Sequence, residues 1–177
     1  MSLIEISRPI EGVVGPLNYP GVPSAGTSEV QTLTLGGTPS GGSFRLAFEG
    51  LSTGPIAWSG TNATLIAHID AALEALPNIG SGGVNVAVGT MTAGVGTATI
   101  TFAGNLAKLA VSTLTVASNA LTGTSPTVAV AKTTPGVTAT FRGASVGAVV
   151  TSTSNGKLYI NSGTALAPVW TVVGSQS

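Results

Sequence analysis

The chain has 177 residues, no cysteine, and six basic and six acidic side chains, so only 7% of its residues are charged, against about 25% in an average soluble domain. The length suits one domain with appendages, and the absence of cysteine excludes disulfides and thiolate chemistry. Hydrophobic residues make up 43% of the chain, which excludes intrinsic disorder and predicts a surface that is partly covered by partners.

The charges are unevenly distributed along the chain. All six acids lie in residues 1–74, and the only charged side chains after Glu74 are Lys108, Lys132, Arg142 and Lys157. The asymmetry is either chance in a small sample or the mark of a polar subunit whose ends meet opposite charges on its neighbours. Four basic residues so far apart form no basic stripe, so nucleic acid is not an expected partner.

No segment is expected to enter a membrane. No run of 18 residues is apolar throughout, and the first twelve residues carry Glu5, Arg8 and Glu11, where a signal peptide needs an uninterrupted apolar stretch. The sequence predicts neither a transmembrane helix nor a signal peptide.

Residues 1–28 are predicted to form an extended arm without regular structure. Four prolines fall within them, and proline fixes φ, removes a donor and extends the residue before it. The arm is either a floppy tail or a segment that docks on another surface, and its apolar side chains, which are costly to leave in water, favour docking. Its candidate partner contacts are Ile4, Ile6, Ile10, Leu17 and Tyr19.

Residues 29–134 are predicted to form a mainly β domain of the α+β class, either a β-sandwich or barrel-like. Apolar and polar residues alternate with the period of two that a half-buried strand requires, as in "EVQTLTL", "SFRLAF", "GVNVAVG", "GTATITF", "STLTVAS" and "PTVAVAK". Clusters of glycine, proline and serine, among them "GGTPSGG" at residues 36–42, are interpreted as hairpin connections between these strands.

One amphipathic helix, at about residues 62–76, interrupts the strands. Leu65, Ile69, Leu73 and Leu76 recur at spacings of four, four and three, which places them on one helical face. Asn62 or Thr61 is a suitable N-cap, and Pro77 ends the pattern.

Residues 135–177 are predicted to form a small C-terminal β-meander with three short strands. Asn155-Gly156 is a strong signal for a two-residue hairpin turn. A sheet this small is marginal alone, so it must pack on the central domain or on copies of itself. Tyr159 and Trp170 are candidate partner contacts, because both combine apolar area with a polar tip; local packing is an equal alternative for them.

The sequence offers little equipment for catalysis. The only histidine, His68, lies about 200° around the helix from Asp70, while Asp70 and Glu74 are side by side at i,i+4. No nucleophile elbow, phosphate loop or calcium loop is present. We therefore expect no enzyme, no catalytic or metal-binding residue, no cofactor and no small-molecule ligand.

Several segments resemble a known module. "GTPSGGSFRLAF" (37–48), "ALEALPNIG" (72–80) and "ATITFAG" (98–104) are similar to a β-rich module that recurs in structural proteins of tailed bacteriophages, notably those of actinobacteria. The resemblance covers about residues 29–134. The final "GKLYINSGTALAPVWTVVG" resembles short C-terminal β units of phage head-decoration and fibre proteins.

The resemblance implies a capsid decoration, or cement, protein on the exterior of the virion. Such a protein binds the major capsid protein, typically as a homotrimer, and stabilises the shell. The family offers no catalytic residues to carry over. Two alternatives stay open, namely a tail or fibre component and a host-surface or carbohydrate-binding module, for which Trp170 beside Asn161 is the candidate sugar platform.

Overall fold

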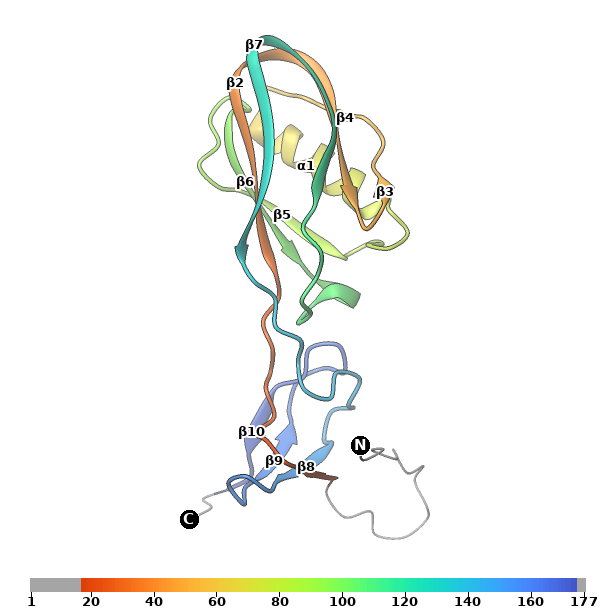
Figure 1. Ribbon diagram of the computed structural model, residues 1–177, viewed down its shortest axis with the longest axis vertical. Helices are drawn as coiled ribbons and strands as arrows, with labels where there is room; N and C mark the ends of the chain where they lie inside the picture. Colours follow the sequence, from red (N-terminus) through yellow and green to blue (C-terminus); the bar gives the residue numbers. More distant parts are fainter. Residues whose placement is uncertain (1–16, 175–177) are drawn as a thin grey trace.

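A computed structural model of the protein describes residues 17–174 (Figure 1). The described part of the chain is elongated, with a larger sheet and an α-helix at one end and a smaller sheet at the other. This confirms the expected β-rich α+β fold. The arrangement is sandwich-like, and the barrel-like alternative is wrong, because the larger sheet is open and does not close on itself.

The larger sheet is built around one long strand. This strand, β2, pairs antiparallel with β7 along almost its whole length, with β6 beside its first half and with β3 and β4 beside its second half, while β5 continues the sheet beyond β6. The strands are β2 (Val30–Phe48), β3 (Leu51–Ser52), β4 (Ile56–Ala57), β5 (Val84–Val88), β6 (Gly96–Phe102) and β7 (Thr115–Thr134).

The "GGTPSGG" segment lies inside β2 and is not a hairpin connection, so that interpretation is wrong. Both β2 and β7 bend sharply over at the far end of the molecule (Figure 1), and the ladder shifts register between Gly36 and Thr38 and again between Pro39 and Gly41. Gly37 and Gly42 have φ of 74° and 83°, a region that favours glycine. The register shifts are β-bulges that bend a continuous strand, with Gly37 inside the first shift and Gly42 just after the second.

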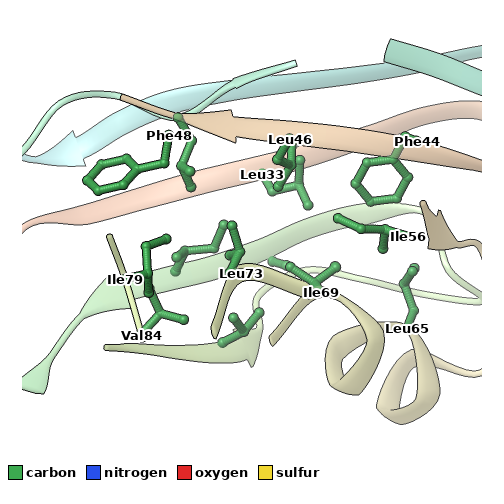
Figure 2. Packing of buried hydrophobic residues seen from close by; sticks show 14 of the residues in the cluster. Leu33, Phe44, Leu46, Phe48, Ile56, Leu65, Ile69, Leu73, Ile79 and Val84 are labelled. Atoms are coloured by element: carbon green, nitrogen blue, oxygen red, sulfur yellow. The ribbon is translucent and has the colours of Figure 1, made fainter. Parts of the chain in front are cut away.

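Helix α1 (Asn62–Glu74) closes the core, as its apolar spacing predicts. Leu65, Ile69 and Leu73 are fully buried, and they point toward side chains of the folded-over sheet, including Phe44 and Leu46 (Figure 2). Thr61 is the N-cap residue but makes no capping hydrogen bond through its side chain. Burial of this apolar stripe against the sheet stabilises the helix more than its cap does.

The smaller sheet contains four short strands in the order β1-β8-β9-β10. The hairpin at Asn155-Gly156 forms between β8 and β9, although its connection is longer than two residues. Leu17–Tyr19 pair parallel with β8, so the prediction that the arm lacks regular structure is wrong for these three residues. The strands are β1 (Leu17–Tyr19), β8 (Val149–Ser152), β9 (Leu158–Asn161) and β10 (Trp170–Val172).

Backbone hydrogen bonds join the two segments that lead into the small sheet to each other and to the larger domain. Thr27 and Val137 exchange two bonds of 2.9 Å each, and the Ala139 N–H donates to the Lys108 carbonyl at 3.0 Å. Lys108 follows the short 3₁₀-helix η1 (Gly104–Leu106). The two chain segments that enter the small sheet are thereby held beside one loop of the larger domain.

Candidate interaction surface on the small sheet

Exposed apolar side chains gather at one end of the molecule. We define the small-sheet end as residues 17–28 and 135–174, whose only charged residues are Arg142 and Lys157. Among the described residues, ten large hydrophobic side chains are exposed, and two of them, Leu51 and Val88, belong to the larger domain. The other eight lie on the small-sheet end: Leu17, Val22, Val137, Val146, Leu166, Val169, Val172 and Val173.

Three aromatic rings form the centre of this end. Phe141 contacts Tyr19 with ring centroids 5.0 Å apart and Trp170 with centroids 5.9 Å apart, both in edge-to-face geometry. The indole N–H of Trp170 donates to the Thr140 carbonyl at 3.0 Å. Edge-to-face pairs are favourable beyond their buried area, so the three rings tie β1, β10 and the segment before β8 into one unit.

A cavity of about 530 Å³ opens beside the aromatic rings. Its wall is mostly apolar and comes from both ends of the chain, since Leu17 of β1 faces Phe141, Val150 and Trp170. Ala144, Ala148 and Val149 complete the apolar lining. A concave apolar surface with few polar groups suits an apolar side chain better than a charged or sugar ligand.

Among the described residues, Arg142 is the one charged residue in the cavity wall. Its Nε donates to the Ala107 carbonyl at 3.1 Å, and Nη2 donates to the Asn105 carbonyl. Within residues 17–174 its guanidinium has no carboxylate partner. Carbonyl oxygens accept hydrogen bonds from the guanidinium, and no carboxylate of the described residues balances its positive charge at the edge of the apolar cavity.

The structure separates the predicted contact residues into four groups, of which the fourth is Tyr159 alone. Ile4, Ile6 and Ile10 lie outside the described residues. Leu17 is 38% exposed, and Tyr19 and Trp170 are half-buried beside the cavity.

Tyr159 has a local role. Its side chain is buried, and its hydroxyl accepts a hydrogen bond from Asn155 Nδ2 at 2.9 Å, so packing within the small sheet accounts for it in this chain. Phe141, which no sequence signal identified, occupies the central position instead.

Asn161 is not available beside Trp170 to bind a sugar. Its side chain is fully buried, its Nδ2 donates to the carbonyls of Ala144 and Ser145, and its Oδ1 accepts from the N–H groups of Gly163 and Val169. The amide is thus used to hold two loops together.

A buried carboxylate joins the ends of the two longest strands. Glu29 is fully buried, accepts a hydrogen bond from Gln31 Nε2 at 2.6 Å and pairs with Lys132 Nζ at 2.7 Å. The N–H groups of Val111 and Gly136 also donate to it. Burial raises the pKa of Glu29, but the bonds from Lys132, Gln31, Gly136 and Val111 outweigh it and hold the pKa below its ordinary value of 4.5.

The helix carboxylates are also structural. Asp70 accepts from the Val86 N–H of β5 at 3.3 Å and Glu74 from the Gly82 N–H just before β5 at 2.7 Å, so the two carboxylates face this strand and the turn before it and not only solvent. Desolvation and the charge of Glu74 raise the pKa of Asp70, against the Val86 bond. His68 Nδ1 lies 2.8 Å from the Ala57 carbonyl.

In residues 17–174 no three histidine or carboxylate side chains gather as metal ligands. No helix in this part of the chain is long and apolar enough to cross a membrane.

No protein family model and no curated protein matches the sequence of this chain. The fold and the surface define a β-rich protein whose small-sheet end is apolar and nearly uncharged.

Proposed function

We propose that this chain is a structural protein of a bacteriophage virion that decorates the outer face of the capsid, binding the major capsid protein as a homotrimer and stabilising the shell. The observation that carries the proposal is the gathering of eight exposed apolar side chains on an end that holds only two charges. An end of a molecule that is rich in exposed apolar side chains and poor in charge is typical of protein–protein contacts.

The distribution of ionisable groups supports a role in adhesion. Glu29, Asp70, Glu74 and Lys132 are held by backbone or side-chain bonds within the fold. Because these groups serve the fold, the exposed surface offers mainly apolar and hydroxyl contacts. A trimer would present three such surfaces to the shell. Once one surface is bound, the other two are held close to the shell at a high effective concentration, which strengthens binding without any new kind of contact.

The phage-like segments support the choice of partner. "GTPSGGSFRLAF" forms the bent half of β2, "ALEALPNIG" ends α1, and "ATITFAG" forms β6. These segments contribute to the core of the larger domain, and the second resembling segment, residues 156–174, contains β9 and β10 of the small-sheet end.

Co-sedimentation with capsid shells tests the proposal. The shells are assembled from the major capsid protein encoded in the same genome, and the variants are V146S/V169S/V172S on the small-sheet end and L51S/V88S on the larger domain, all at exposed positions. We expect the wild type and L51S/V88S to sediment with shells and the triple variant to remain in the supernatant. Failure of the wild type to bind shells would overturn the proposal.

A further inference from the structure

The apolar cavity lies where the N-terminal segment joins the folded body. Leu17 lines the cavity and is the residue at which the described part of the chain begins. Sixteen residues precede it in the sequence. The cavity is therefore open at the place where a long apolar segment is covalently attached.

The N-terminal segment matches the cavity in both polarity and charge. It carries Glu5 and Glu11 but only one basic side chain, Arg8, whereas the small-sheet end has only Arg142 and Lys157. Arg142, in the cavity wall, has no carboxylate partner among the described residues. The apolar residues of the segment are Leu3, Ile4, Ile6, Ile10, Val13 and Val14.

We infer that the cavity binds apolar side chains from residues 3–14 of a second copy of this chain, with a segment carboxylate beside Arg142. This inference rests on the homotrimer of the proposed function. The two residues next to Leu17, Gly15 and Pro16, carry no large flexible side chain, so the apolar side chains for the cavity come from residues 3–14. In an extended chain, alternate side chains point to the same side, so Gly15 would be the next residue on the same side as Leu17.

The isoleucines are far enough from Leu17 to reach a neighbour. Extended chain advances about 3.3 Å per residue, so Ile6 can lie roughly 36 Å from Leu17. In a closed ring, each copy would give one segment and receive one. Every cavity would then be filled, and the exposed apolar area of each copy would fall.

Engineered cysteines test the exchange on a clean background, because the chain has no cysteine. Two differently tagged full-length chains are co-expressed, one with a single cysteine at I4C, I6C or I10C and the other with A148C, a half-buried alanine of the cavity wall. The matched control replaces A148C with A87C, an exposed alanine of β5 in the larger domain. Mild oxidation is followed by non-reducing electrophoresis.

We expect a covalent dimer that carries both tags, at least tenfold more abundant with A148C than with A87C for at least one segment position. Equal yields with both partners would overturn the inference. A disulfide that forms only within a single doubly substituted chain, such as I6C/A148C, would also overturn it, because the segment would then occupy its own cavity.

A second measurement separates this inference from the proposed function. The full-length I4S/I6S/I10S variant is expected to lose the trimer in light scattering, with an unchanged far-ultraviolet circular dichroism spectrum. A trimer that binds shells but gives no A148C cross-link contradicts the segment exchange alone. A cross-linked trimer that ignores shells contradicts the capsid assignment alone.

Discussion

The carboxylate of Glu29 lies 2.7 Å from the ammonium group of Lys132, at the point where β2 begins and β7 ends. Glu29 is fully buried, whereas the Lys132 side chain is 32% exposed. The pair therefore joins the two longest strands at the end of the ladder nearest the small sheet (Figure 1). Because of this difference in exposure, replacing Lys132 and replacing Glu29 should lower the free energy of unfolding by different amounts.

Removing Lys132 should destabilise the fold more than neutralising Glu29. Lys132→Met leaves a buried carboxylate without its counter-charge, which costs about 3 kcal/mol in comparable pairs. Glu29→Gln leaves an ammonium group that can reach water, and the expected cost is about 1–2 kcal/mol of lost hydrogen bonding. Urea unfolding measures both, with Lys157→Met as the control. A Lys132→Met variant as stable as Lys157→Met would contradict this account.

Glu29 should also make stability depend on pH in the acid range. Its pKa is lowered in the folded state, so its contribution is fully present above the unfolded value near 4.5 and is lost as the pH falls through the folded pKa. Unfolding free energies between pH 7 and pH 2 should fall less steeply below pH 4.5 in Glu29→Gln than in the wild type. If the free energies of unfolding of the two proteins fell equally steeply with pH, the pKa of Glu29 would not differ between the folded and unfolded states.

Asp70 should behave in the opposite sense. Its pKa is raised in the folded state, so its favourable contribution is present below the unfolded value of 3.8 and is lost as the pH rises through the folded pKa. Asp70→Asn keeps an oxygen that can accept from the Val86 N–H and removes the repulsion with Glu74. We expect thermal unfolding at pH 7 to show a gain of about 0.5 kcal/mol. A clear loss of stability would mean that the charged carboxylate is needed.

The bend in β2 should depend on Gly42. Its φ is 83°, and an added Cβ would lie 2.3 Å from the Ala120 carbonyl oxygen, so Gly42→Ala should cost about 2 kcal/mol or more. Gly54 has no atom within 4 Å of its added Cβ and no positive φ. Gly54→Ala should therefore be neutral or stabilise by up to about 1 kcal/mol. Similar unfolding midpoints for the two variants would contradict the proposed origin of the bend.

Local periodicity was sufficient to predict the helix and most strands. Leu65, Ile69 and Leu73 have the spacing of one helical face, and all three are buried. The alternation in "GTATITF" likewise predicted β6. These patterns predict the elements because the side chains on the buried face of a helix or strand recur at a fixed spacing in the sequence.

Contacts between distant parts of the chain left no such local signal. The glycines of "GGTPSGG" have the composition of a turn, and only the pairing with β7 shows that they bend a strand. The pairing of Leu17 with Val150 and the ion pair of Glu29 with Lys132 join segments far apart in sequence. Phe141 is a single aromatic in an irregular loop, so its central place between Tyr19 and Trp170 follows only from the tertiary structure.

The most direct test of the central claim is a cryo-electron microscopy reconstruction of capsid shells incubated with the purified protein. The proposal predicts groups of three copies of the chain on the outer face of the shell, with the small-sheet end at the contacts with other protein and the bent end of β2 and β7 pointing away. Shells without added density would contradict it. So would a bound molecule whose small-sheet end projects into solvent.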